Sequence, residues 1–264
     1  MWYLTPFFVF SVIGAIGLLS LLPMTRMTAN KILLEQSEIG MGETQLAFVL
    51  LVNPLILLLE AAAIGSALAD HAGLRSVLLD ALRGRGAVLP DWRDLALAAG
   101  LGLLVSVIIL LVQFAMQAMN WVTPGNEGSG MESQSEFRVS ALLYGGVTEE
   151  IIMRFGLMTL LLWGTAMILR LENASDAGFA VWFAIVVSAV IFGLGHLPAA
   201  AVNSPLTHTS IAAIVGLNAI AGIAYGWLYW RTSLEMSMLA HMATHIGFWT
   251  FGPALSQVIG QARA

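Results

Sequence analysis

The chain has 264 residues, of which 58% are hydrophobic and only 10% are charged, and its mean hydropathy is +0.85. A water-soluble domain carries about 25% charged residues, so this composition indicates an all-α, polytopic membrane protein built as a helical bundle. Cysteine is absent, which excludes disulfides, thiolate metal sites and cysteine nucleophiles. The net charge of -5 is small and the basic residues are scattered, so the sequence provides no nucleic-acid surface.

Apolar segments long enough to cross about 30 Å of hydrocarbon recur along the chain. An eighth span would result if the segment 139–169 were broken, or if the amphipathic stretch 30–41 entered the membrane interface. The first apolar run lacks a basic n-region and continues to Leu22, so we expect a retained span rather than a cleaved signal peptide. In total we predict seven spans, at about 3–23, 45–69, 95–119, 139–169, 179–200, 210–230 and 234–256.

The charge of the loops indicates how the chain is oriented in the membrane. Residues 70–94 hold the only concentration of basic side chains, and the positive-inside rule therefore places this loop in the cytoplasm. Alternation of the spans then puts the N-terminus inside as well, in a multi-pass protein of the inner (plasma) membrane. The polar, turn-forming stretch 123–130 separates an N-terminal part of about three spans, 1–122, from a C-terminal core, 139–256.

The fourth predicted span contains three ionisable groups, Glu149, Glu150 and Arg154. Charges at membrane depth are costly and usually functional. Glu150 and Arg154 are four residues apart, about 40° around a helix, and can form an ion pair. Glu149 lies about 100° from Glu150, so the same arginine cannot easily satisfy both. Glu149 must face another partner or a water-filled cavity, which suits a residue that takes and returns a proton.

Histidines occur in two later spans. His196 follows Phe192 by four residues near the end of the fifth span, where a histidine can equally be an interfacial residue. His241 and His245, at i and i+4 of the last span, could ligate one metal as zincin histidines do, or could hydrogen-bond within the bundle. The glutamate that follows the first histidine of a zincin motif is replaced here by Met242. The three histidines and the Glu-Glu-Arg cluster all lie in the C-terminal half, which favours one shared site.

The sequence lacks the residues that other kinds of intramembrane protease and nucleotide-binding proteins require. The sequence has no Gly-x-Ser-Gly at a span centre, which argues against a serine nucleophile of the rhomboid kind, and no Walker or dinucleotide glycine motif. A two-aspartate protease is also excluded, because every aspartate lies in a predicted loop or at a span end: Asp70, Asp80, Asp91, Asp94 and Asp176.

Three motifs, Glu149-Glu150-x-x-x-Arg154, Phe192-x-x-x-His196 and His241-x-x-x-His245, follow one another on successive apolar segments. Together they resemble the CPBP family of intramembrane proteases, which includes the eukaryotic CAAX prenyl endopeptidase and many bacterial bacteriocin-immunity (Abi-like) and processing proteins. The resemblance covers roughly residues 139–256. It implies an intramembrane endopeptidase that hydrolyses a peptide bond in a membrane-embedded or membrane-associated protein or peptide.

The resemblance also implies roles for single residues. Glu149 would activate water with the help of His196, Glu150 and Arg154 would organise the site, and His241 would polarise the scissile carbonyl. The family commonly has asparagine, a natural oxyanion donor, where this chain has His245.

This departure leaves two mechanisms open. In the preferred one no cofactor is needed, and His241 and His245 stabilise the oxyanion. In the other, His196, His241 and His245 bind zinc and Glu149 acts as the base.

Depth in the membrane gives a partial check on whether Glu149, His196 and His245 lie close enough to form one site. At about 1.5 Å per residue, Glu149 and His245 come to similar depths of about 15 to 16 Å, whereas His196 is about 10 Å too shallow. Convergence of all three is therefore a prediction. Two alternatives to a protease remain, a transporter or proton-relay protein that uses the same charges, and a non-enzymatic immunity or scaffold protein of the same fold.

Overall fold

The computed structural model describes residues 3–36, 40–86, 88–119, 121, 135–203 and 205–262, and the regular elements in these ranges are all helical, as predicted. The polar linker predicted at 123–130 and part of the stretch 30–41 lie outside the described residues. The elements are α1 (Leu4–Ser20), α2 (Leu22–Glu35), α3 (Glu43–Leu68), α4 (Val77–Leu82), α5 (Trp92–Ala118), α6 (Ser135–Ser140), η1 (Ala141–Glu149), η2 (Ile151–Met158), α7 (Thr159–Leu169), η3 (Ala174–Asp176), α8 (Gly178–Gly195), α9 (Leu197–Asn203), α10 (His208–Arg231) and α11 (Leu234–Ala262).

Five of the described helical segments are long and apolar enough to cross a membrane: α3, α5, the helix 135–169, the segment 178–202 and α10. Helices α1 and α2 meet at 50° and qualify together as a sixth. The chain is therefore a multi-pass membrane protein, but the predicted count of seven spans is not confirmed.

Two regions account for the difference between the seven predicted spans and the candidate spans of the structure. The first apolar run ends as a straight helix at Ser20, and the chain bends into the more polar α2, which has Pro23 in its first turn. Helix α11 has 29 residues but is not among the candidate spans, because its turns carry serine, threonine and the two histidines. The alternative of a broken fourth span is wrong, since Ser135–Leu169 is one continuous helix.

We call Ser135–Leu169 the central helix. Its middle consists of two π-helical segments, η1 and η2, in which the backbone bonds run from i to i+5. The Oγ1 atoms of Thr148 and Thr159 lie 3.5 and 3.2 Å from the carbonyl oxygens of Leu143 and Arg154, five residues earlier in each case. Glu149 and Glu150 stand at the junction of the two segments, and π geometry of this kind is frequent at functional sites.

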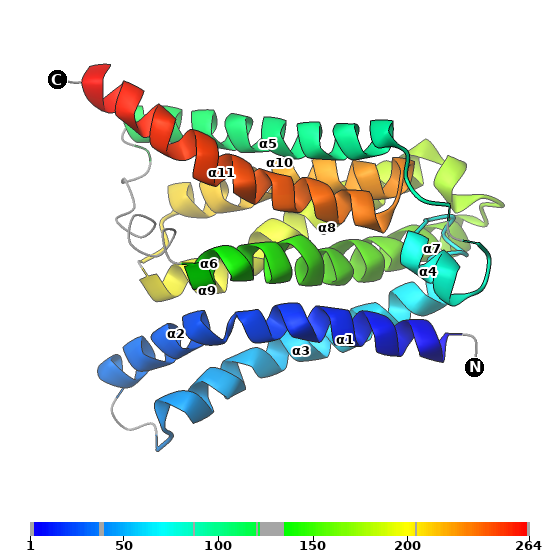
Figure 1. Ribbon diagram of the computed structural model, residues 1–264, viewed down its shortest axis with the longest axis horizontal. Coiled ribbons are helices and arrows are strands. Elements are labelled where there is room, and N and C mark those ends of the chain that lie inside the picture. Colours follow the sequence, from blue (N-terminus) through cyan, green and yellow to red (C-terminus); the bar gives the residue numbers. More distant parts are fainter. Residues whose placement is uncertain are drawn as a thin grey trace.

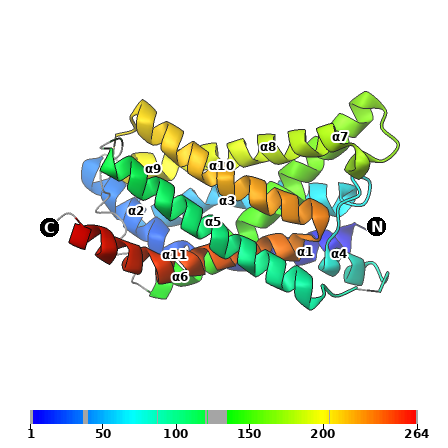
Figure 2. The ribbon, with the colours of Figure 1, turned by 90° about the horizontal axis from the view of Figure 1, so that it is seen from above.

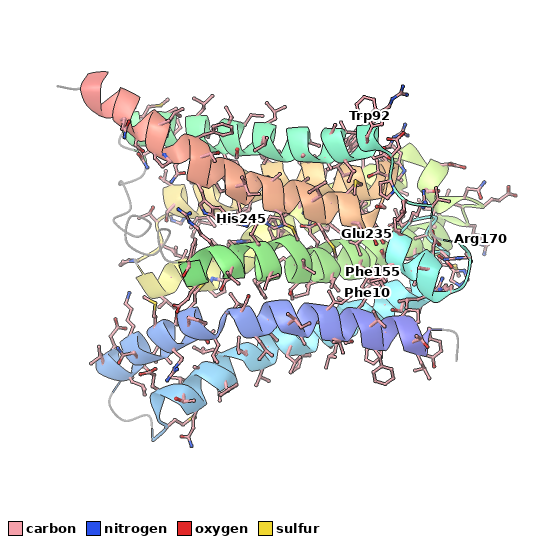
Figure 3. The ribbon with its side chains drawn as sticks, in the orientation of Figure 1. Phe10, Trp92, Phe155, Arg170, Glu235 and His245 are labelled. Atoms are coloured by element: carbon pink, nitrogen blue, oxygen red, sulfur yellow. The ribbon has the colours of Figure 1, made fainter. Side chains whose placement is uncertain are left out.

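The other helices surround the central helix. Helices α1 and α3 pack on one side, α5 and α11 lie on the opposite side, and α8 and α10 form a third layer (Figures 1 and 2). Phe10 of α1 meets Phe155 with 4.2 Å between ring centroids (Figure 3). Gly65 of α3 is needed at the same place, because a Cβ there would come within 2.2 Å of the Phe155 ring. The charged part of the central helix is thus enclosed by protein. The division into parts 1–122 and 139–256 stays a prediction.

The loop between α3 and α5 holds the beginning of α11. The Glu235 carboxylate accepts hydrogen bonds from the Ser76 hydroxyl at 2.7 Å and from the next two backbone amides at 3.0 Å each, at the N-terminus of α4. The amide of Leu234 donates to the carbonyl of Arg75 at 3.0 Å. A carboxylate is favourable at a helix N-terminus, so α11 starts from a fixed position.

Candidate active site

Glu150 is fully buried and has partners on both carboxylate oxygens. Oε2 lies 3.4 Å from Nε of Arg154 and accepts a hydrogen bond from the Ser237 hydroxyl. Oε1 lies 2.9 Å from Nδ1 of His241. The predicted ion pair between Glu150 and Arg154 is therefore confirmed, with two further donors from α11 that satisfy the remaining lone pairs.

Arg154 is also fully buried, and aromatic rings surround its charge. One terminal nitrogen donates to the carbonyl of Gly222 at 3.2 Å. The guanidinium carbon lies 5.2 Å from the ring centroid of Phe192 and 5.7 Å from that of Tyr225, within cation–π range. Rings from α8 and α10 thus fix a cation that would be costly to bury without such contacts.

Glu149 has a different environment from its neighbour. Its side chain is 19% exposed, and its Oε2 lies 4.0 Å from Nε2 of His241. That separation is too long for a direct hydrogen bond, and it is a distance that one bridging water can span. Arg154 pairs with Glu150 and not with Glu149, as the spacing predicts.

His241 connects the two carboxylates. Because the ionised Glu150 carboxylate can only accept, Nδ1 of His241 donates to it, and Nε2 is the nitrogen directed toward Glu149. The ring is buried and stacks on Tyr225, with 4.6 Å between centroids and 22° between planes. A hydrogen bond on one nitrogen fixes the tautomer and the direction of the other.

His245 lies one turn further along α11, with its ring stacked on His241 at 5.0 Å and 16°. Both Nε2 atoms converge on the backbone of Gly145: a Cβ at this glycine would be 2.8 Å from Nε2 of His245 and 3.6 Å from Nε2 of His241. Nε2 of His245 is buried and has no hydrogen-bond partner among the described residues. Figure 3 shows His245 between α11 and the central helix, away from the end with Glu235.

His196 follows the last residue of α8. Its Nδ1 lies 2.8 Å from the carbonyl oxygen of Phe192, which can only accept, so Nδ1 carries a proton and a neutral ring has its lone pair on Nε2. The Phe192 ring meets His196 at 4.7 Å and His241 at 5.9 Å, edge-on in both cases. The predicted contact between Phe192 and His196 is confirmed. Within the described structure, however, His196 forms no hydrogen bond or ion pair with either glutamate, so its convergence with them is only indirect.

The zinc alternative requires three ligands at one point. Among the described residues, no group of three histidine, aspartate or glutamate side chains is arranged to hold a metal ion. His241 stacks face to face with His245, and its Nδ1 is occupied by Glu150. In this arrangement the described side chains form no ready ligand set, and the choice between the metal-free and the zinc mechanism stays a prediction.

Sequence reasoning missed two partners of the site. Ser237 binds Glu150, and its position one turn before His241 could have indicated this, because residues i and i+4 share a helix face. Tyr225 covers the His241 ring, but a tyrosine in an apolar span gives no signal of which residue it contacts.

Comparison with known proteins gives a family match for part of the chain. A family model described as type II CAAX prenyl endopeptidase Rce1-like matches residues 135–247. Residues 135–247 are therefore similar to this protease family, and we call them the CPBP segment. Searches with the chain found no significant match to a curated protein or to a solved structure.

The CPBP segment includes every residue of the described cluster. It begins with the central helix and ends two residues after His245, so it contains Glu149, Glu150, Arg154, His196 and His241 as well. Helices α1, α3 and α5 lie outside it and, in the described residues, provide no ionisable side chain to the cluster. The N-terminal helices therefore support a site that the CPBP segment forms.

Proposed function

We propose that this chain is an intramembrane endopeptidase in which Glu149 activates the attacking water. The observation that carries the proposal is the difference between two adjacent carboxylates. Glu150 uses both oxygens for buried partners, whereas Glu149 is partly exposed and faces an imidazole nitrogen at 4.0 Å. A general base must be able to reach water and substrate, and of the two carboxylates only Glu149 has that freedom.

In the proposed reaction a water lies between Oε2 of Glu149 and the scissile carbonyl carbon. Glu149 takes one proton as the water oxygen bonds to that carbon, and the carbonyl oxygen becomes an oxyanion. The C–N bond then breaks, the carbonyl re-forms, and Glu149 returns the proton to the leaving nitrogen. The products are a carboxylic acid and an amine, and Glu149 is again ionised.

The two stacked histidines, His241 and His245, are placed to stabilise the oxyanion by hydrogen bonds. With Nδ1 held by Glu150, a doubly protonated His241 would present Nε2–H toward the reacting centre. Nε2 of His245, which has no partner in the described structure, faces the same point beside Gly145. Two donors aimed at one developing charge are what an oxyanion hole requires. His245 would replace the amide that is common in the family.

His196 has a supporting role in this proposal. Its fixed tautomer leaves Nε2 free to accept a proton or a hydrogen bond, and it is separated from His241 by the Phe192 ring. We assign it to the substrate side of the site, where it would assist Glu149 only after substrate binds. The proposed mechanism uses no metal step, which is supported by the lack of a three-residue ligand set among the described side chains.

Substrate class and orientation are further parts of the proposal. The family description names a CAAX prenyl endopeptidase, so a prenylated peptide with a CAAX end is the first probe to use. Bacteriocin leaders, lipoproteins and C-terminal sorting signals are the other classes. We place the chain in the inner (plasma) membrane, with the arginine-rich loop and the N-terminus in the cytoplasm.

The test compares membranes of cells that carry the wild type with those that carry Glu149→Gln. The expected result is a membrane protein or peptide whose processed terminus disappears in the variant, while the variant itself remains folded and abundant. Retained processing by Glu149→Gln would overturn the assignment. Stoichiometric zinc in the purified wild type that is lost in His245→Ala would overturn the metal-free mechanism.

A proton relay would use the same groups but arrange them differently. A relay needs ionisable groups along a path through the bundle, whereas the described ion pairs of the core gather around one turn of the central helix. Proton flux in vesicles that disappears in Glu149→Gln, without any change in peptide processing, would favour the relay.

A further inference from the structure

Four aromatic rings form a stacked column beside the reacting groups. Tyr225 stacks on His241 at 4.6 Å and 22°, His241 on His245 at 5.0 Å and 16°, and His245 on Trp249 at 6.2 Å and 25°. Three of the four residues are spaced at i, i+4 and i+8 on α11, so one helix face presents them in line. We call these four rings the ring column.

A guanidinium lies over the ring at each end of the column. Arg154 is 5.7 Å from the ring centroid of Tyr225, and Arg138 is 5.3 Å from that of Trp249. Tyr225 is further fixed by its hydroxyl, which donates to Thr244 at 2.7 Å. The column thus runs from the fully buried arginine to an exposed one.

The two histidines of the column are held in different ways. His241 has a hydrogen bond from Nδ1 to Glu150, which sets its ring direction. His245 has no hydrogen bond to any described side chain or backbone group, and its buried Nε2 is unpaired. Its ring direction therefore depends on its neighbours: His241 at one stacked contact, Trp249 at the other, and Phe248 edge-on at 6.1 Å.

We propose that Trp249 is a positioning residue, whose indole keeps the His245 ring turned so that Nε2 faces the reacting carbonyl beside Gly145. The inference rests on the proposed function, in which His245 donates to the oxyanion. Without the indole, the His245 ring could rotate about its Cβ–Cγ bond, because no hydrogen bond opposes that rotation. Trp249 would then act on turnover through His245 and not on substrate binding.

The experiment uses the purified full-length chain and a prenylated CAAX peptide as the probe. We expect Trp249→Leu to lower kcat about tenfold, as small misplacements of a catalytic group do, with KM unchanged. Trp249→Phe, which keeps a ring at this position, should retain most of the turnover. The matched control is Trp182→Leu, the same change at an exposed position of α8, which should leave both constants unchanged.

A double-mutant cycle separates positioning from a general structural effect. In a His245→Ala background, Trp249→Leu should cause no further loss, because the group that it positions is already gone. Full additivity of the two losses, or an unchanged kcat in Trp249→Leu while Glu149→Gln is inactive, would overturn the role of Trp249. Turnover that persists in Glu149→Gln would instead overturn the proposed function, and the two failures are thus distinguishable.

A measurement that needs no substrate tests the same contact. In protein labelled at the histidine Cε1 carbon, Trp249→Leu should shift and broaden the NMR signal of His245, and Trp249→Phe should restore its sharpness. The signal of His208, at the start of α10, should not move. A His245 signal that stays equally sharp in Trp249→Leu would contradict the proposal, whether or not the probe is cleaved.

Discussion

The two sides of the site differ more than their sequence suggests. On one side, the buried Glu150 carboxylate forms an ion pair with Arg154 and accepts hydrogen bonds from Ser237 and His241. On the other, Glu149 is partly exposed, and Nε2 of His245 has no partner in the described structure. The paired side holds His241 in place, and the unpaired side retains capacity to bind water and substrate. Under the proposed function, Glu150 therefore serves structure and Glu149 serves chemistry.

Removal of the unpaired carboxylate should have the largest effect on activity. We expect Glu149→Gln to reduce peptide cleavage by about 100- to 10,000-fold, the range for loss of a general base. The unfolding temperature should stay close to that of the wild type, because Glu149 forms no buried ion pair with an arginine of the described chain. The activity is measured by cleavage of the prenylated peptide, and the stability by thermal unfolding in the same detergent. A large fall in stability would place Glu149 on the structural side.

Removal of the paired carboxylate should act mainly on stability. Glu150→Ala leaves the Arg154 charge buried without its partner, so the free energy of unfolding should fall by about 3 to 5 kcal/mol. Arg154→Ala is the matched change, and the double variant should lose less than the sum of the two, which unfolding in denaturant would show. A Glu150→Ala protein as stable as the wild type would remove the distinction between the two glutamates.

Filling the space between the two Nε2 atoms tests the unpaired side without a change of charge. Gly145→Ala puts a methyl 2.8 Å from Nε2 of His245, so the ring must move, and turnover should fall about tenfold or more. Gly164→Ala on the same continuous helix meets nothing within 4 Å and serves as the control. Equal turnover in both variants would show that the space beside Gly145 has no part in the reaction.

A paired carboxylate outside the membrane should show the smallest effect. Burial raises the pKa of Asp70, but hydrogen bonds from Arg85 and the charges of Arg83 and Arg85 outweigh it and hold the pKa below its ordinary 3.8. The stability from this contact is present above pH 3.8 and is lost as the pH falls through the lower folded-state pKa. We expect Asp70→Asn to lower stability near neutral pH by no more than about 1 kcal/mol, because the group is partly exposed.

Thermal unfolding across a pH series gives the measurement for Asp70. The curves of Asp70→Asn and wild type should differ at neutral pH and converge at acid pH below the lowered folded-state pKa, where the carboxylate is protonated in both states. Curves that stay parallel to the lowest pH would mean that Asp70 contributes by packing and not by charge. Asp70 and Glu150 would then differ in how deeply they are buried, and a charge effect would no longer be part of the comparison.

Helical periodicity predicted part of this arrangement and missed the rest for physical reasons. The i, i+4 spacing was sufficient for the pair Glu150–Arg154, because both residues lie on one continuous helix. The span predicted at 234–256 is not confirmed, since the polar residues of α11 lower its apolarity. Contacts between helices, such as Ser237 with Glu150, depend on how α11 is rotated against the central helix, and that rotation is set by packing.

The π-helical register of the central helix has a consequence for how the chain can tolerate changes in length. Where i to i+5 bonding meets ordinary α-helix, the segment carries one residue more than an α-helix would need for the same run of turns. Deletion of one residue between Ala141 and Met158 could therefore leave an unbroken span of nearly the same length. The widened turn would then tighten to α-helical bonding, and the side chains on both sides of the deletion would keep their directions. A comparison of homologous chains that aligns the Glu-Glu-Arg motif without regard to this extra residue would match letters whose side chains face different helices.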